Sequence, residues 1–283
     1  MLYPDAASWR AAPRKSVLFF GMSGLGKTHI SKLLVQGGDW FHYSIDYRIG
    51  TAGMHRHIKD NLIAHAMREP FLAQMLRADA MYLDPIVHDH DLTAVSAYLG
   101  KPGCGGLPID EYRRRQTQFR EAEIAALTDT PQFIDRAHDL YGYPHFICDT
   151  GGSICEWINP DDRDDPLMTK LAAHCLPIWI KGSEAHAQEL IRRFDRAPKP
   201  MAYQPAFLER VWSQYLSENN VQEGEVDPDT FIRWTYAQAL AHRQPRYAAM
   251  ARFGVTVTAE EVHAVTDSAA FEALIAAKLD TQA

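Results

Sequence analysis

A chain of 283 residues with 46% hydrophobic and 23% charged residues has the composition of an ordinary globular protein with an ample core. Its formal net charge of -7 disfavours a general nucleic-acid binder, because such proteins usually carry a basic excess. The cysteines form no CxxC pair, and no apolar run reaches membrane-spanning length, so we expect a reduced, cytoplasmic protein without a signal peptide or membrane segment.

Short apolar runs alternate with helical patterns along the chain, which is typical of a parallel α/β sheet with helices on both faces. Most of these runs end against Gly, Asp or Ser, as buried parallel strands do. The expected strands, five in number, are 17–20, 40–44, 145–148, 177–180 and 255–258.

The span between the second and third expected strands is longer than one crossover helix requires. Segments 57–67 and 70–83 carry apolar residues at helical spacing, glycines and prolines interrupt 100–108, and a polar helix follows over 109–127. Residues 207–252 are again mostly helical in pattern. We therefore expect a single domain, 1–283, with a helical insertion at about 48–107.

The segment SVLFFGMSGLGKTHI, residues 16–30, contains a complete GxxxxGK[ST] pattern, which arises by chance in a chain of this length about once in a hundred. An apolar strand precedes it and a helical pattern follows. Backbone N–H groups of such a loop surround phosphate oxygens at the positive end of a helix. We expect this loop to bind ATP through Gly21, Met22, Ser23, Gly24, Leu25, Gly26, Lys27 and Thr28.

Two loop side chains have separate expected roles. Lys27 is expected to reach the β- and γ-phosphates and to take part in catalysis, and the Thr28 hydroxyl to bind Mg²⁺. Two carboxylates follow expected strands: Asp46 on the side of the sheet where the loop lies, and Asp149 directly after the third strand.

Further motifs occur in an informative order, and in them the chain resembles shikimate kinase and related small-molecule kinases such as gluconate kinase, all of the P-loop NTPase superfamily. After the phosphate loop come a strand-end acid, a G…I…E…FR…E helix, a TGGG-like turn, a short basic lid and a late R…Y helix. Here these are Asp46, Gly106 to Glu123 with Phe119-Arg120, Thr150-Gly151-Gly152-Ser153, Lys199-Pro200-Met201, and Arg243 with Tyr247.

The resemblance implies a three-layer P-loop fold and a role for each matching residue. Asp46 would bind the acceptor hydroxyl and act as general base or orient it, and Arg120 and Arg243 would hold an anionic group of the acceptor. The Gly151-Gly152 turn would offer backbone N–H groups to that acceptor. In a lid at about 193–205, Lys199 would close over the ATP phosphates, while Arg192 would lie against the adenine.

The chain also departs from the family pattern. The first acid of the second strand, associated with Mg²⁺, is Ser44 here, and Asp149 is the candidate to replace it, through water or directly, in the manner of a Walker-B aspartate. Whether Asp46 or Asp149 is the base stays open. The insertion falls where the family covers its acceptor, which disfavours shikimate itself and favours a larger or differently shaped molecule.

We therefore expect an ATP- and Mg²⁺-dependent kinase of a small, anionic, hydroxylated metabolite. One alternative is an ATPase switch that binds a protein partner through the insertion, which an exposed apolar face over residues 56–82 would support. A kinase of nucleotides or nucleic-acid ends is a third, less favoured by the net charge. The stretch VHDHD, residues 87–91, is interpreted as a polar loop rather than a metal site, since no third ligand can be placed.

Overall fold

The computed structural model describes residues 2–88 and 92–281. The chain divides into two compact units: unit 1 comprises residues 1–45, 127–198 and 233–283, and unit 2 comprises residues 46–126 and 199–232. Unit 2 is therefore larger than the insertion expected from the sequence, because it also contains most of helix 109–128 and residues beyond the fourth strand. Residues 89–91, which belong to the VHDHD stretch, lie outside the described residues.

Unit 1 is built on a five-stranded, all-parallel sheet with the order β2-β3-β1-β4-β5. The three central strands are buried on both faces over nearly their whole length, as expected for parallel strands, whereas the edge strands β2 and β5 are partly exposed. In the register, Phe19 of β1 and Ser44 of β2 both pair with Asp149 of β3, so these strands end at one edge. The strands are β1 (Ser16–Phe20), β2 (Trp40–Ser44), β3 (His145–Asp149), β4 (Leu176–Lys181) and β5 (Val255–Thr258).

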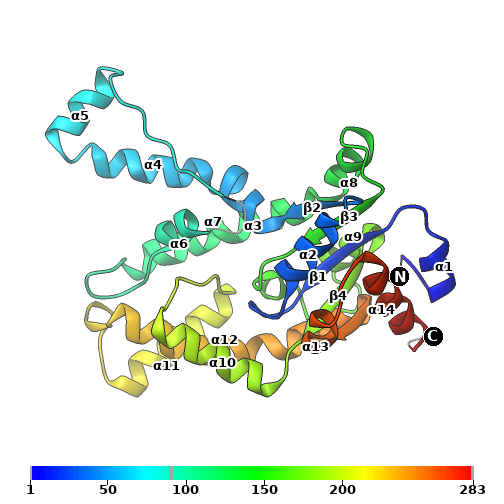
Figure 1. Cartoon of the computed structure of the whole chain (residues 1–283). Helices are drawn as coiled ribbons and strands as arrows, with labels where there is room; N and C mark the ends of the chain where they lie inside the picture. Colours follow the sequence, from blue (N-terminus) through cyan, green and yellow to red (C-terminus); the bar gives the residue numbers. More distant parts are fainter. Residues whose placement is uncertain (1, 89–91, 282–283) are drawn as a thin grey trace. The chain divides into compact units, whose positions relative to one another are not determined.

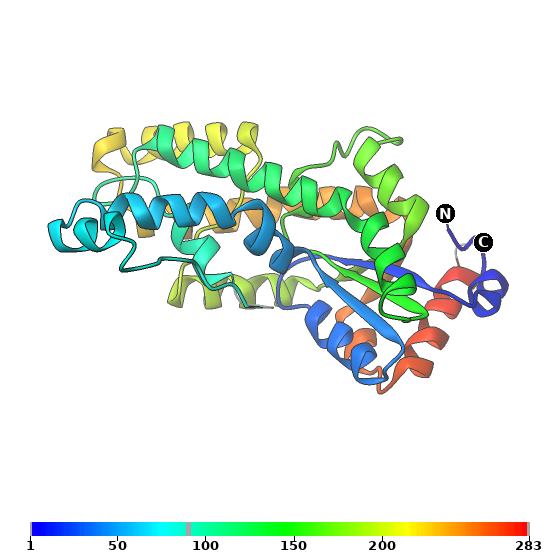
Figure 2. The ribbon, with the colours of Figure 1, turned by 90° about the horizontal axis from the view of Figure 1, so that it is seen from above.

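Helices cover both faces of this sheet, as the blue and red helices on one side and the green ones on the other show in Figure 2. Alternation along β2 explains the two layers: Trp40 packs on Phe271 of α14, whereas Tyr43 packs on Phe133 of α8. The predicted α/β fold is confirmed. The helices of unit 1 are α1 (Ala6–Ala11), α2 (Lys27–Gln36), α8 (Thr130–Asp139), η2 (Ile154–Glu156), α9 (Pro166–His174), α10 (Glu184–Arg196), η4 (Ala251–Phe253), α13 (Ala259–His263) and α14 (Ser268–Asp280).

Unit 2 is helical (Figure 1). Two glycines let segments of unit 2 approach each other closely. A Cβ on Gly53 would lie 2.4 Å from the Cβ of Ala122, and one on Gly103 would lie 2.2 Å from the carbonyl oxygen of Val226, so a side chain would clash at either position. Helix α12 (Pro228–Met250) begins in unit 2 and continues in unit 1, and α3 (Ile45–Arg48) starts with the last residue of unit 1. The other helices of unit 2 are η1 (Ile49–Gly53), α4 (His55–Ala66), α5 (Pro70–Arg77), α6 (Thr93–Leu99), α7 (Ile109–Thr128), α11 (Pro205–Asn219) and η3 (Glu223–Glu225).

One expected helix is shorter than its pattern indicated. The apolar spacing predicts a helix over 70–83, but α5 ends at Arg77. Asp79 has φ +51°, a left-handed conformation that a continuing helix cannot accommodate. None of the helices in the described ranges is both long enough and apolar enough to cross a membrane.

Candidate phosphate-binding and catalytic site

The predicted phosphate loop connects β1 to α2 in unit 1, and its backbone is curled as the sequence pattern indicates. Gly21, Gly24 and Gly26 have φ +138°, +79° and +104°, which glycine adopts readily and other residues avoid. At Gly21 a side chain is excluded on a second ground, because a Cβ there would lie 2.5 Å from the carbonyl oxygen of Ile180 in β4.

Lys27, the first residue of α2, turns its buried side chain back over the loop. Its ammonium donates hydrogen bonds to the carbonyl oxygens of Gly21 (2.9 Å) and Met22 (3.0 Å). Met22 and Leu25 are buried and pack on Gly182, whereas Ser23 and Gly24 are exposed. The loop therefore turns two apolar side chains inward and places a cation beside its own backbone, which suits an anionic ligand.

The predicted TGGS turn lies against this loop. Thr150 Oγ1 donates to the carbonyl oxygen of Phe19 at 2.8 Å, which ties the turn to the end of β1. A Cβ on Gly152 would lie 3.6 Å from the Ser23 nitrogen and 3.8 Å from the Gly21 oxygen, and Tyr247 donates its hydroxyl to the Gly152 carbonyl. Gly151 is buried beside it. The structure thus brings the turn and the phosphate loop together.

Asp149, at the carboxyl end of β3, has a side chain that is only 8% exposed. Its Oδ2 lies 3.4 Å from Nε2 of His42, and among the described residues its Oδ1 has no hydrogen-bond partner. The Thr28 hydroxyl likewise makes no hydrogen bond within the described part of the chain. A carboxylate and a hydroxyl with spare lone pairs fit a hard cation such as Mg²⁺ or its water ligands, so the residues present fit the expected metal.

Arg243 has a different setting from the one the resemblance implied. It is 4% exposed, and its Nε donates to Oε1 of the fully buried Glu156 at 2.6 Å, while His242 Nε2 lies 3.3 Å from Oε2. Burial alone would raise the pKa of Glu156, but Arg243 and His242 outweigh it and lower the pKa to about 2. Arg246 donates to the carbonyl oxygens of Cys155 and Ile158. These arginines hold the segment that follows the TGGS turn; an acceptor role for Arg243 stays a prediction.

Helix α10 contacts the phosphate loop, and the arginine at this contact is Arg193, the neighbour of the predicted Arg192. A Cβ on Gly24 would lie 3.3 Å from Leu190 Cδ2 and 3.9 Å from Arg193 Nη1. Arg192 is 64% exposed and pairs with Glu189 at 3.1 Å, as does Arg193 at 3.2 Å. Lys199 is exposed in unit 2. Arg193 therefore lies beside the loop, and the adenine role of Arg192 stays a prediction.

The other two acceptor candidates, Asp46 and Arg120, belong to unit 2. Asp46 is half-buried in α3, and Arg120 is exposed on α7. Within the described residues Arg120 makes no hydrogen bond or ion pair, unlike the other arginines of α7. Those three are engaged: Arg113 with Glu209 at 2.7 Å, and Arg114 and Arg115 with Glu111 at 2.7 and 2.6 Å.

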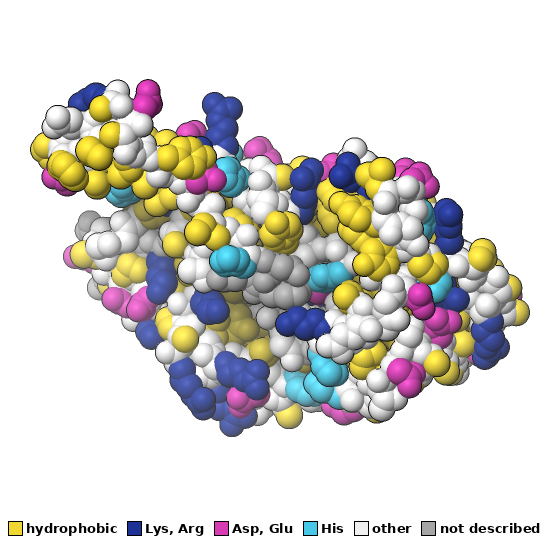
Figure 3. All heavy atoms as spheres, turned by 45° about the horizontal axis from the view of Figure 1, so that its top comes forward, with side chains coloured by type: hydrophobic (Ala, Val, Ile, Leu, Met, Phe, Trp, Pro, Cys, Tyr) yellow, Lys and Arg dark blue, Asp and Glu magenta, His cyan; other side chains and the backbone are white. Residues whose placement is uncertain are grey.

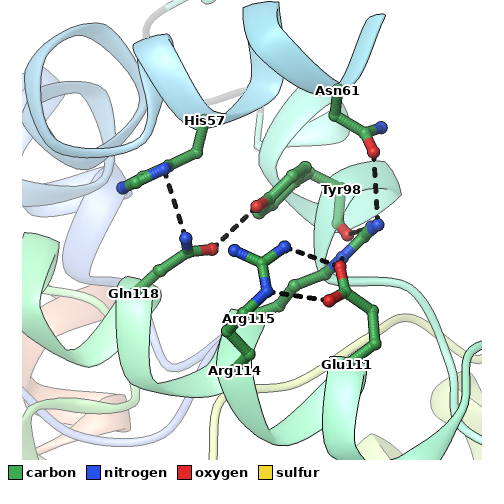
Figure 4. A network of polar contacts seen from close by, with 7 residues as sticks. All are labelled: His57, Asn61, Tyr98, Glu111, Arg114, Arg115 and Gln118. Carbon is green, nitrogen blue, oxygen red and sulfur yellow. Dashed lines mark hydrogen bonds and ion pairs between the residues drawn. The ribbon is translucent and has the colours of Figure 1, made fainter. Parts of the chain in front are cut away.

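The network of Glu111 joins three helices of unit 2 (Figure 4). Arg115 also donates to the Tyr98 carbonyl and to Asn61 Oδ1, and Gln118 contacts His57 at 3.2 Å and Tyr98 at 2.7 Å. Hydrogen bonds from Arg114, together with Arg115, hold the pKa of Glu111 at about 2 despite its partial burial. Glu111, the glutamate that matches the family motif, and its partners Arg114 and Arg115 therefore link the helices of unit 2. Arg120 is left as the available cation of α7.

Sequence reasoning missed His42 and Glu156. Alternation along β2 places His42 on the same face as Ser44, a usable signal, because Ser44 pairs with Asp149 in the register. Glu156 had no such signal, since its partner Arg243 is 87 residues away.

Comparisons with known proteins add little to this geometry. No protein-family model matches the chain, and no curated protein does. Among solved structures, shikimate kinase from Bacteroides thetaiotaomicron matches with a TM-score of 0.30 and 15% identity, over 80% of this chain and 97% of that one. A likeness of that size assigns no family to the chain.

Proposed function

We propose that the protein is an ATP- and Mg²⁺-dependent phosphotransferase that moves the γ-phosphoryl group to a hydroxyl of a small anionic metabolite. The observation that carries this proposal is the phosphate loop, with its glycines at positive φ and the buried Lys27 ammonium on its carbonyl oxygens. Phosphoryl transfer needs little covalent chemistry from a protein; it needs phosphates that are positioned and charges that are neutralised.

The chain supplies groups for each of these tasks. Lys27 and the loop N–H groups would bind the phosphates, and Thr28 and Asp149 would hold Mg²⁺, which when bound supplies positive charge to the phosphates. Asp46 orients the acceptor hydroxyl. The N–H groups of Gly151 and Gly152 would donate to the acceptor. Arg192 would lie against the adenine, and Lys199 would close over the ATP phosphates.

Of the two arginines proposed for the anionic group of the acceptor, Arg120 is the more available. Arg120 is exposed and makes no ion pair within the described residues, whereas Arg243 is committed to the buried Glu156. Taking Arg243 from Glu156 would leave a buried carboxylate without its main partner. We therefore assign the acid group of the acceptor first to Arg120.

ATP consumption over a panel of hydroxy acids, sugars and polyols tests the proposal. We expect an acceptor that stimulates turnover, a loss on the order of 10²-fold in Lys27→Ala, and loss of the stimulation in Asp46→Asn. Arg120→Ala should raise the KM for that acceptor about tenfold or more, whereas Arg113→Ala, on the same helix but paired with Glu209, should not. Steady hydrolysis that no acceptor stimulates would contradict a kinase.

A second candidate is an ATPase switch with a protein partner, which one observation favours. Large apolar side chains are exposed at Leu62 (40%), Phe71 (65%), Tyr82 (72%) and Ile86 (74%), all within α4, α5 and the segment after them. Figure 3 shows apolar side chains gathered over the α4–α5 segment at the upper left. If this candidate is right, hydrolysis is independent of acceptors and Phe71→Ser with Ile86→Ser leaves it intact.

A further inference from the structure

Two histidine rings lie beside the phosphate loop in unit 1. His29 follows the phosphate-binding residues on α2, and His263 ends α13; their rings are parallel within 12°, with centroids 5.6 Å apart. A Cβ on Gly26 would lie 3.4 Å from His263 Cε1. The missing side chain at Gly26 thus lets α13 approach the loop directly.

The orientation of the His263 ring is held by its own helix. Its Nδ1 lies 2.6 Å from the carbonyl oxygen of Ala259, and because a carbonyl only accepts, Nδ1 carries the proton and donates. Both histidines are exposed. A ring that is held from one side and open on the other can serve as a surface on which a flat ligand stacks.

The order of the strands indicates which part of a nucleotide comes near these rings. Asp149 ends β3, on one side of β1, whereas His263 follows β5, on the other side of β1 beyond β4. Because the proposed function puts the γ-phosphate beside Asp149, on the β3 side of β1, the nucleoside end of a bound triphosphate is expected on the opposite side of the loop, toward β4 and β5. The nucleoside then leaves the loop where His29 and His263 lie.

We propose that His263, backed by His29, is the platform on which the base of the bound nucleotide stacks, so that the site takes a purine nucleoside triphosphate rather than a bare polyphosphate. This inference rests on the proposed nucleotide site but not on the transfer reaction or its acceptor. Imidazole rings stack on bases in the same way as other aromatic side chains do. A metal is not the better explanation of the pair, because within the described residues no group of three or more His, Cys, Asp or Glu side chains is arranged to hold one.

The test compares two ligands that share phosphates and differ in the base: Mg²⁺-ATP and Mg²⁺-tripolyphosphate, each measured by equilibrium binding. We expect His263→Ala to weaken ATP about tenfold, equivalent to about 1.4 kcal/mol, and to leave tripolyphosphate unchanged. His263→Phe should keep ATP affinity within about twofold of the original, because it keeps a stacking ring. His65→Ala, an exposed histidine on α4, is the matched control and should change neither ligand.

The outcomes separate this inference from the proposed function. If His263→Ala weakened the binding of ATP and of tripolyphosphate equally, the ring would be needed for the shape of the loop, and the platform would be overturned. Unchanged affinity for ATP in this variant would also overturn the platform. Binding of ATP with the expected variant pattern, but without phosphoryl transfer to any acceptor, would support the platform and contradict the kinase. If the unmodified protein bound neither ligand, the phosphate site and the platform would both be overturned.

Discussion

At the scale of single residues, the buried pair of Arg243 and Glu156 makes a sharp prediction about stability. Arg243→Met removes the cation and leaves a carboxylate in a fully buried position, so we expect a loss of about 3–5 kcal/mol in the free energy of unfolding. Combining Arg243→Met with Glu156→Leu removes both charges and should recover most of that loss. Urea denaturation of both single variants and the double variant, analysed as a cycle, measures the coupling.

Acid provides an independent check on the same pair. Because the folded-state pKa of Glu156, about 2, lies below its ordinary value of 4.5, ionisation of this carboxyl stabilises the fold at neutral pH. That contribution is lost as the pH falls from about 4.5 toward 2. The double variant should therefore lose less stability over this pH range than the unmodified protein. An equal loss in both would mean that Arg243 and Glu156 are not coupled in solution.

At the scale of elements, the five strands could be predicted from the sequence because each is a short stretch rich in aliphatic, aromatic or β-branched residues. Strands β2 and β5 have the predicted bounds, and each of the other three strands is one or two residues longer than predicted. The phosphate loop was predictable for a similar reason, since its glycines, Lys27 and Thr28 are adjacent in sequence. The pairs that complete the site were not: His42 with Asp149 and Glu156 with Arg243 meet only after the sheet has formed.

The approach of β5 to β4 gives a prediction at this scale. Gly254, just before β5, has an extended φ of -162°, yet a Cβ there would lie 1.9 Å from the carbonyl oxygen of Pro177. Gly254→Ala therefore creates a steric clash although its φ is allowed. We expect the free energy of unfolding, measured by heat or urea, to fall by about 3 kcal/mol. Gly224→Ala is the control, since no atom lies within 4 Å of its Cβ, and it should be neutral or slightly stabilising. Equal effects would show that β4 and β5 are not packed as described.

At the scale of the whole molecule, the cysteines report separately on the two units. Cys148, Cys155 and Cys175 belong to unit 1 and are fully buried, whereas Cys104 belongs to unit 2 and is exposed. Burial raises the pKa of the Cys148 and Cys155 thiols to about 12 and that of Cys175 well above its usual range. A thiol must ionise to react, so these three are protected twice, by exclusion of the reagent and by the low thiolate population.

Titration with a thiol reagent at pH 8 should therefore show one fast thiol in the folded protein and four after denaturation. Cys104→Ser should remove the fast phase and leave the slow ones, because these depend on opening of unit 1. Lys27→Ala should leave the slow phases at their original rates as long as the sheet is intact, so the titration also checks that a loss of ATP binding in that variant is not a loss of fold. Two or more fast thiols in the unmodified protein would mean that the sheet opens far more often than its burial indicates, since each slow cysteine lies in or next to a strand or in the segment that Arg246 holds.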